Sequence, residues 1–257
     1  MTRSNYGVSF FRIPQEHFLI NTFDTSTLRF FNQFAQRWPS FDRLICLVSN
    51  DFLLRGGVIT AILWWAWFRP SNDRLRDRQI ILSGAFAGLV SISGARALVA
   101  MLPFRARPID VPSLHFRPPI GFSQAGLIHW SSFPSDHAVL YFALATIVCL
   151  ISWRAGILTY CFAFFVVCLP RIYLGLHYPT DILAGEVIGV LAVYIFSRPL
   201  LRQPISEPLL RWHDRSPGSF YAFLYLGTFA LATNMESLRV YMSFLLELVL
   251  GLFHHGH

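Results

Sequence analysis

The feature that most constrains the fold is a succession of long apolar runs separated by polar connections that contain arginine. The 257-residue chain is 54% hydrophobic and only 14% charged, whereas ordinary globular domains carry about 25% charged residues. Apolar runs of this kind are typical of helices that cross a bilayer, because a helix satisfies its own backbone polar groups. We therefore predict an all-α integral membrane bundle of about six transmembrane helices joined by short loops.

The six predicted spans are, in approximate bounds, residues 52–68, 80–102, 134–151, 157–169, 182–196 and 220–232. A further apolar run, residues 241–253, has only about 13 residues where a crossing needs ~20, so it is either short and tilted or interfacial. Aromatic residues at helical spacing in residues 28–38 suit a helix that lies at the membrane surface or one that packs on the bundle. We divide the chain into an N-terminal segment, residues 1–50, which is interfacial or packed on the bundle, and one membrane-embedded domain, residues 51–257.

The formal net charge is +7, and all 21 basic residues are arginine. In a soluble protein this charge would suggest nucleic-acid binding, but here the arginines fall mostly between apolar runs, and we predict no nucleic-acid partner. Short arginine-rich loops stay in the cytoplasm, which places the connections after the first, third and fifth spans inside. We therefore predict a multi-pass protein of the plasma (inner) membrane. The same rule leaves residues 1–50 outside despite their five arginines, so the topology of that segment stays open.

Three polar clusters lie in the connections predicted to face outward. They are Arg105 and Arg107 before Pro108, the tripeptide Ser135-Asp136-His137, and the segment from Arg171 through His177 to Asp181. Charged groups and imidazoles are costly at a membrane boundary unless they act together. Each cluster alone has a structural explanation, such as a surface loop, a helix N-cap or a hydrogen-bonding histidine. Their ordered occurrence on one side of the membrane favours a functional site.

The residue types in these clusters suit the binding and attack of a phosphate. Arginine presents a planar fork that matches phosphate oxygens, and Ser135 opens a helix whose free N–H groups bind anions. His177 and Asp181 are four residues apart, so one helical turn brings the carboxylate to the imidazole and makes the histidine a better nucleophile. His137 is suited to protonate the departing oxygen as a general acid. The spacing of the four cysteines fits neither a zinc site nor a disulfide framework, and we predict no metal and no cofactor.

The three clusters resemble the signature of the type 2 phosphatidic acid phosphatase superfamily, membrane enzymes that share a helical core with vanadium haloperoxidases. That signature reads Lys-x6-Arg-Pro, then Pro-Ser-Gly-His, then Ser-Arg-x5-His-x3-Asp. This chain is similar in Arg107-Pro108, in Pro134-Ser135-Asp136-His137, and in Pro170-Arg171 through His177 to Asp181. The motifs cover about residues 96–185, and the layout of the spans extends the likeness to about residues 50–235.

The resemblance implies hydrolysis of a phosphate ester through a phosphohistidine, without a metal. By analogy, His177 is the nucleophile, Asp181 is its partner and His137 is the general acid. The residues implied to hold the phosphate oxygens are Arg107, Arg171 and Ser135.

The lysine of the family signature is missing, since its position holds Ala100. Either Arg105 or Arg96, one helical turn before Ala100, replaces it. We favour Arg105 slightly because it stands at the predicted membrane exit, whereas Arg96 is also placed to pair with the intramembrane Glu186.

Two further positions depart from the signature. Asp136 replaces the glycine of the second motif, so its N–H remains available while its carboxylate must point away from a phosphate. Pro170 replaces the serine before Arg171, which removes a hydroxyl and an N–H from that corner.

The Pro-Ser-Asp-His variant is similar to the bacitracin-resistance type of undecaprenyl pyrophosphate phosphatase. The favoured hypothesis is therefore hydrolysis of undecaprenyl (polyprenyl) diphosphate to the monophosphate and phosphate at the outer membrane face. One alternative is a phosphatase or phosphotransferase of the same family that acts on phosphatidate, phosphatidylglycerophosphate or lipid A. Another is an inactive relative that binds lipid or serves as a scaffold. Residues 51–257 would then form a lipid phosphatase domain, and the oligomeric state stays open.

Overall fold

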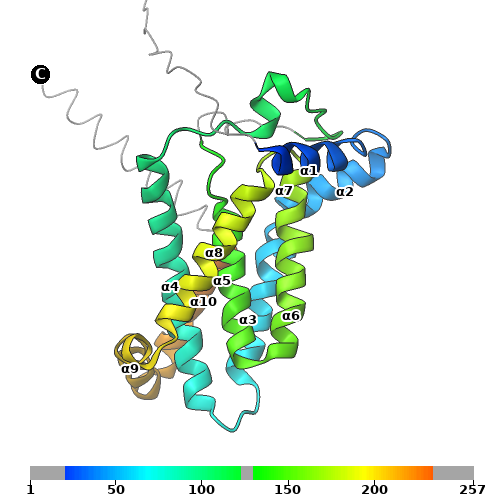
Figure 1. Ribbon diagram of the computed structural model, residues 1–257. Helices are drawn as coiled ribbons and strands as arrows, with labels where there is room; N and C mark the ends of the chain where they lie inside the picture. The colour runs from blue at the N-terminus through cyan, green and yellow to red at the C-terminus, as the bar shows by residue number, and fades with distance from the viewer. Residues whose placement is uncertain (1–20, 123–129, 234–257) are drawn as a thin grey trace, which may run out of the picture.

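The structure is a computed structural model that describes residues 21–122 and 130–233. All regular secondary structure in these two ranges is helical, which confirms the predicted all-α class. The long helices stand side by side as a bundle (Figure 1). The last apolar run, residues 241–253, lies outside the described residues.

Every predicted span within the described ranges forms a helix. They are η1 (Leu53–Gly57) with α3 (Val58–Phe68), α4 (Arg74–Met101), α5 (Asp136–Ile151), α6 (Trp153–Phe162) continued by η4 (Ala163–Cys168) and α7 (Leu169–Tyr173), α8 (Pro179–Phe196), and α10 (Pro217–Ala232). The remaining elements are α1 (Thr22–Asn32), α2 (Pro39–Asn50), the short turns η2 (Pro108–Asp110) and η3 (Pro112–Leu114), and α9 (Pro199–Arg215).

The expected number of spans was too high by the criterion of length and composition. Among the described residues, three helices are long and apolar enough to cross a membrane: Arg74–Val99, Trp153–Tyr173 and Pro179–Phe196. A fourth is obtained if Pro39–Asn50 and Leu53–Phe68, which bend by 66° at their junction, count as one span. The 16-residue α5 is apolar but shorter than these helices. Its 16 residues rise only ~24 Å, which is less than the ~30 Å thickness of a hydrocarbon core.

Helix α5 forms the centre of the bundle and packs against α3, α4, α6 and α8. All residues from Ala138 to Val148 are buried. A helix that is apolar around its whole circumference is buried either in lipid or among other helices, and α5 is buried among other helices. The central position of α5 fixes the location of its N-terminus, where the second polar motif lies.

Helices α5 and α8 approach closely because α8 carries Gly185 and Gly189 on the face toward α5. A Cβ atom at Gly189 would lie 2.2 Å from the carbonyl oxygen of Val139, and one at Gly185 would lie 2.7 Å from that of Ser135. The spacing Gly-x3-Gly is a common device for close helix contact in membranes. At the end of this contact, the Ser135 N–H donates to the Asp181 carbonyl oxygen at 3.1 Å, which joins the second and third motifs directly.

Residues 21–50 pack on the bundle at the end where α5 and α8 begin. Helix α1 contacts α7 and α8, and α2 contacts α7, with Leu28 and Asp24 of α1 buried. The N-cap of α1 is Asn21, whose side chain accepts from the Asp24 N–H at 2.7 Å. The segment thus contributes to the same end of the molecule as the polar motifs (Figure 1).

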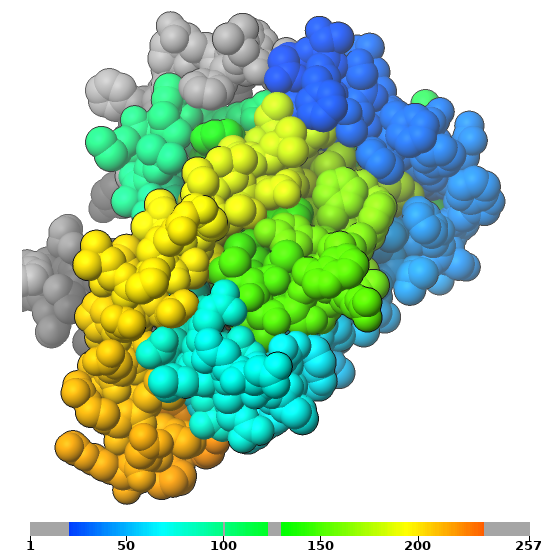
Figure 2. Space-filling view, turned by 60° about the horizontal axis from the view of Figure 1, so that its bottom comes forward, coloured from blue at the N-terminus to red at the C-terminus, as the bar shows by residue number. Residues whose placement is uncertain are grey.

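The opposite end of the bundle is formed by α9 and by the connections α3–α4 and α5–α6. Figure 2 brings this end forward, with the α3–α4 connection in cyan and the α5–α6 turn in green. Its exposed arginines include Arg74, Arg76, Arg154, Arg198 and Arg211. The arginine-rich connections and the polar motifs therefore lie at opposite ends of the bundle.

Candidate active site

The three polar motifs meet in one cavity of about 160 Å³ at the end of the bundle where α4 ends and α5 begins. Its wall contains Val99, Trp130, Ser131, Pro134 and Leu176 besides charged groups. Six of the predicted site residues line it: Arg96, Arg107, Asp136, His137, Arg171 and His177. The other three, Asp181, Ser135 and Arg105, lie outside its lining. The three guanidinium groups exceed the single carboxylate, so the cavity favours an anion.

His177 is held in the short connection between α7 and α8. The chain turns at Gly175, whose φ of 70° a residue with a side chain rarely adopts. His177 is buried, and its Nδ1 lies 2.8 Å from the carbonyl oxygen of Ser132. A carbonyl oxygen only accepts hydrogen bonds, so Nδ1 carries the proton and donates it. Nε2 of the neutral ring therefore keeps its lone pair.

Asp181 lies behind His177, with its carboxylate beside the Nδ1 side of the ring. Its Oδ2 is 3.6 Å from Nδ1 of His177, and the same oxygen accepts the Tyr178 N–H at 2.8 Å. The other carboxylate oxygen pairs with Arg105. The predicted proximity of Asp181 and His177 is therefore present, while the hydrogen bond that fixes the tautomer goes to Ser132. A main-chain acceptor carries no signal in the sequence.

The pKa of His177 lies below its ordinary value of 6.5, chiefly because burial disfavours the charged ring. Asp181 acts in the opposite direction through its negative charge, and the nearby Arg107 and Arg171 lower the pKa further. The ring is consequently neutral at neutral pH, which is the form that can act as a nucleophile.

Arg107 and Arg171 are both buried and are oriented by main-chain oxygens. Nη1 of Arg107 donates to the Leu176 carbonyl at 2.8 Å, and Nη2 of Arg171 donates to the Ser49 carbonyl at 3.0 Å. The Nε atom of Arg171 is buried and makes no hydrogen bond within the described part of the chain. Buried donors of this kind are suited to bind the oxygens of an entering phosphate.

His137, in the first turn of α5, faces two guanidinium groups. Its Nε2 accepts from Nη1 of Arg55 at 2.7 Å and from Nη2 of Arg171 at 2.9 Å. Guanidinium groups only donate, so in this state the proton of the neutral ring is on Nδ1. Sequence reasoning missed Arg55, which stands in an apolar run. The sequence did carry a signal for Arg55, since an arginine in an apolar run is costly unless it has a partner.

Arg96 and Asp136 form an ion pair at the cavity wall. Nη2 and Nε of Arg96 lie 3.1 and 3.3 Å from Oδ2 of Asp136. The expected partner of Arg96 was Glu186, so that expectation is wrong: the substituted second motif supplies the carboxylate instead. The Asp136 carboxylate points at Arg96 and thus neutralises part of the positive charge.

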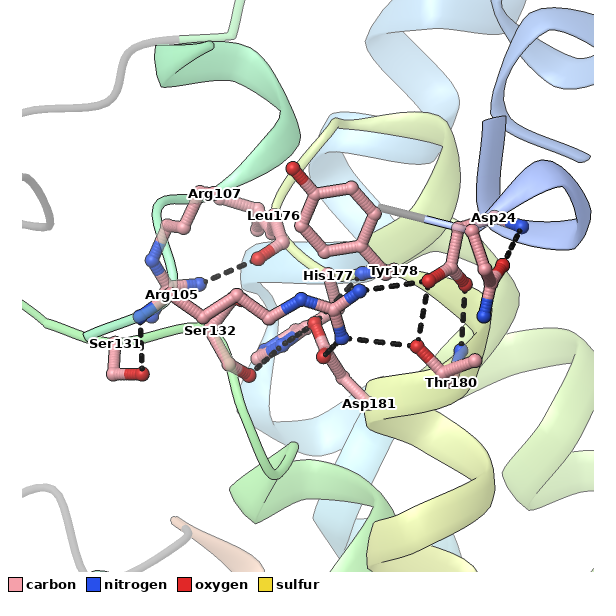
Figure 3. A network of polar contacts seen from close by, with 11 residues as sticks. Asp24, Arg105, Arg107, Ser131, Ser132, Leu176, His177, Tyr178, Thr180 and Asp181 are labelled. Carbon is pink, nitrogen blue, oxygen red and sulfur yellow. Dashed lines mark hydrogen bonds and ion pairs between the residues drawn. The ribbon is translucent and has the colours of Figure 1, made fainter. Parts of the chain in front are cut away.

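Arg105, which the sequence slightly favoured as the replacement for the missing lysine, is turned away from the cavity. Its guanidinium pairs with Asp24 at 2.7 Å and with Asp181, donates to Thr180 Oγ1 at 2.9 Å, and lies 4.0 Å from the Tyr178 ring centroid (Figure 3). The geometry therefore favours Arg96 over Arg105 as the additional cation of the cavity. Asp24 is a second residue that sequence reasoning missed.

Ser135 is completely buried and serves as the N-cap of α5. Its Oγ accepts the Ala138 N–H at 3.5 Å. The hydroxyl does not line the cavity, so the position predicted to hold phosphate instead fixes the start of the helix that carries Asp136 and His137.

Comparison with known proteins identifies the family of the segment that forms the cavity. A family model described as the PAP2 superfamily matches residues 85–203, the range that contains every cavity residue. The chain is 42% identical over 67 residues to the bacitracin transport permease protein BcrC of Bacillus licheniformis, a match that covers 26% of this chain and 32% of that protein.

Two proteins of Escherichia coli (strain K12) match over longer ranges. The lipid A 1-diphosphate synthase is 25% identical over 223 residues, which cover 80% of this chain and 87% of that protein. The putative undecaprenyl-diphosphatase YbjG is 24% identical over 179 residues, or 67% and 80% of the two chains. No solved structure matches the chain significantly.

Residues 85–203 are thus a PAP2 superfamily domain, which confirms the resemblance that the three motifs carry. The class that this domain and the candidate membrane spans define is a helical membrane protein of the PAP2 superfamily type.

Proposed function

We propose that the protein hydrolyses undecaprenyl (polyprenyl) diphosphate to the lipid monophosphate and inorganic phosphate at the outer face of the plasma membrane. The observation that carries this proposal is the buried His177, whose Nδ1–H is held by the Ser132 carbonyl at 2.8 Å in a cavity lined by three arginines. In the proposed arrangement, residues 51–257 form the membrane-embedded lipid phosphatase domain.

In the first step, Arg107 and Arg171 hold the terminal phosphate with Arg96 at the wall. Nε2 of His177 attacks phosphorus, and the bond from phosphorus to the bridging oxygen breaks. His137 gives a proton to the departing lipid monophosphate. For this step the entering phosphate takes over the N–H donors of both Arg55 and Arg171, which frees Nε2 of His137 to take a proton from solvent. The ring then gives this proton to the departing oxygen, and the second step returns one to it.

In the second step, water attacks the phosphohistidine. His137 takes one proton from the water, the bond between nitrogen and phosphorus breaks, and inorganic phosphate leaves with His177 restored as a neutral ring. Asp181, 3.6 Å from Nδ1, stabilises the positive charge on the imidazole while it bears phosphorus. Within residues 21–122 and 130–233, no group of three or more His, Cys, Asp or Glu side chains is placed to hold a metal ion. The proposed steps use side chains alone.

A lipid diphosphate suits the mixed lining of the cavity. Besides its charged groups, the wall includes Val99, Trp130 and Leu176, and Trp130 is about half exposed. A head group that enters while its apolar tail stays in the bilayer would meet both kinds of surface. The putative undecaprenyl-diphosphatase among the relatives supports the same substrate class.

The test is phosphate release by the purified protein, in detergent with a chelator, from a panel of lipids. The panel contains undecaprenyl diphosphate, phosphatidate, phosphatidylglycerophosphate and lipid A. We expect undecaprenyl diphosphate to be preferred and His177→Ala to abolish release. Preference for a glycerolipid would overturn the substrate assignment, and an unchanged rate in His177→Ala would overturn the nucleophile. Absence of release from every lipid would favour a binding or scaffold protein.

A second candidate is transfer of the phosphoryl group from His177 to another lipid. It is favoured by the match to the lipid A 1-diphosphate synthase, which covers 80% of this chain. Adding lipid A to undecaprenyl diphosphate that is labelled in its terminal phosphate distinguishes the two reactions. Hydrolysis leaves the label in inorganic phosphate, whereas transfer moves it to lipid A.

A further inference from the structure

Asp24 of α1 makes a set of contacts that joins the N-terminal segment to the active site. It is completely buried. Its Oδ2 lies 2.7 Å from Nη2 of Arg105 and accepts the Thr180 hydroxyl at 2.7 Å, while its Oδ1 accepts the Thr180 N–H at 3.0 Å (Figure 3). Asp24 lies well before residues 85–203, the range that matches the family model.

Arg105 is the residue that connects Asp24 to the reacting histidine. Its guanidinium lies between two fully buried carboxylates, with Asp24 on one side and Asp181 on the other (Figure 3). Asp181 is in turn 3.6 Å from Nδ1 of His177. A buried charge is tolerated only when its partners balance it. The number of carboxylates that pair with Arg105 therefore determines how much of the negative charge of Asp181 remains uncompensated beside His177.

The charge balance shows what Asp24 adds. Arg105 and Asp181 alone would form a neutral pair, and the addition of Asp24 leaves the cluster with one net negative charge. The other charged or titratable groups around His177 are Arg107 from the preceding loop, Arg171 from α7, and, across the cavity, His137 and Asp136 of α5 and Arg96 of α4. Cations predominate among them, so the negative cluster is the main counter-charge on the Nδ1 side of the ring.

We propose that Asp24 is a positioning residue of the active site, which shares Arg105 with Asp181 and so preserves the negative charge that His177 requires. This inference rests on the proposed role of His177 as nucleophile. In a buried site, charges interact more strongly than in water, so a carboxylate three contacts away alters the reactivity of the ring. Residues 21–50 are then part of the catalytic unit.

The test compares Asp24→Asn with the wild-type enzyme by kcat, KM and the pH dependence of kcat/KM on undecaprenyl diphosphate. In the proposed role, the negative charge that Asp24 adds to the cluster favours the protonated ring of His177. Its removal lowers the pKa of that ring and shifts the acid limb of the profile to lower pH by about one unit, with kcat lower by roughly tenfold. KM changes little, since Asp24 does not line the cavity.

Thr180→Val is the matched control, because it removes a hydroxyl that bonds both Asp24 and Arg105 but changes no charge. Its acid limb is expected to coincide with that of the wild type even if the protein is less stable. An acid limb that moves as far as in Asp24→Asn would assign the effect to packing and overturn the proposal.

The double variant Asp24→Asn/Arg105→Gln covers the case in which Asp24→Asn alone fails to accumulate in the membrane. It leaves Asp181 as the only charge of the cluster, with the same net charge as in the wild type, so its acid limb is expected at the wild-type pH. A wild-type limb in Asp24→Asn, or a displaced limb in the double variant, would overturn the role of Asp24. Failure of the proposed function is recognised separately, because His177→Ala would then retain activity.

Discussion

Nδ1 of His177 and the carbonyl oxygen of Ser132 lie 2.8 Å apart, so the main chain fixes the tautomer of the candidate nucleophile. Asp181, at 3.6 Å from the same nitrogen, is left to act through its charge. In a Ser-His-Asp triad, the carboxylate has both tasks, and its amide variant costs ~10⁴ in kcat because the wrong tautomer forms. The two tasks are divided between two groups in this site.

The first prediction concerns Asp181→Asn. Because Ser132 continues to hold the tautomer, we expect kcat to fall only about 10- to 100-fold, less than in a triad, whereas His177→Ala loses all activity. Phosphate release from undecaprenyl diphosphate measures both variants. Equal loss in the two would mean that Asp181, and not the Ser132 carbonyl, determines the state of the ring.

The second prediction concerns pH. The protonated ring of His177 cannot attack, and its pKa lies below the ordinary 6.5 because of burial. The rate should therefore persist at pH 6.5 and fall only as the pH drops through the lowered value. For the same reason, the contribution of this histidine to stability is present above pH 6.5 and is lost as the pH falls through its folded pKa.

Arg107→Gln serves as the control for this pH dependence, since Arg107 lowers the pKa of His177. Its removal should move the acid limb of kcat/KM to higher pH, opposite to the shift expected for Asp24→Asn. If the acid limb of kcat/KM does not move, it reports the protonation of a group other than His177.

The third prediction separates Arg96 from Arg105. Arg96 lines the cavity and pairs with Asp136 at 3.1 Å. Arg96→Gln should raise the inhibition constant of inorganic phosphate roughly tenfold, the order of one charge-assisted hydrogen bond. Asp136→Asn should lower it, because the arginine is released from its carboxylate. Arg105→Gln should leave it nearly unchanged. A larger rise of the inhibition constant in Arg105→Gln than in Arg96→Gln would instead assign the phosphate contact to Arg105.

The apolar runs allowed the helices to be predicted because helix formation in an apolar environment is governed locally. The bend of 66° between Pro39–Asn50 and Leu53–Phe68 was not predicted, because the angle between two helices depends on tertiary packing that a single sequence does not specify. Arg55 lies just after this bend, with its Nη1 2.7 Å from Nε2 of His137. An arginine at the start of an apolar run indicates that a partner exists, but the sequence does not specify that the partner is His137.

The candidate site was predicted to the extent that it follows motif spacing. His137, His177 and Arg171 are on the cavity wall as expected. Asp24 was not anticipated, because it is separated from Arg105 by 81 residues in the chain and belongs to no spaced pattern. Long-range ion pairs of this kind depend on tertiary packing, which a single sequence does not specify.

The fourth prediction tests the proposed orientation in the membrane. Ser113, in η3, and Glu207, in α9, are both exposed and belong to the two opposite ends. In a variant without its native cysteines, Ser113→Cys should react with a membrane-impermeant thiol reagent added to intact cells, and Glu207→Cys should react only after the cells are opened. The opposite result would place the site in the cytoplasm.

The fifth prediction concerns the contact between α5 and α8 that holds the second and third motifs together. A Cβ atom at position 189 would lie 2.2 Å from the Val139 carbonyl oxygen, so Gly189→Ala must push the helices apart. We expect a loss of about 1–3 kcal/mol in the free energy of unfolding. Activity should also be lower, because the Ser135 N–H bond to the Asp181 carbonyl lies at the end of this contact.

Gly94→Ala provides the matched control for Gly189→Ala. Position 94 is within α4, and nothing lies within 4 Å of a Cβ atom added there. Alanine has the higher helix propensity by ~1 kcal/mol, so this variant should be as stable as the wild type or slightly more stable. Thermal unfolding in detergent and phosphate release measure both variants. Equal stability of the two would show that α5 and α8 adjust to the added methyl group, and that the close contact is not required to align His137 with His177.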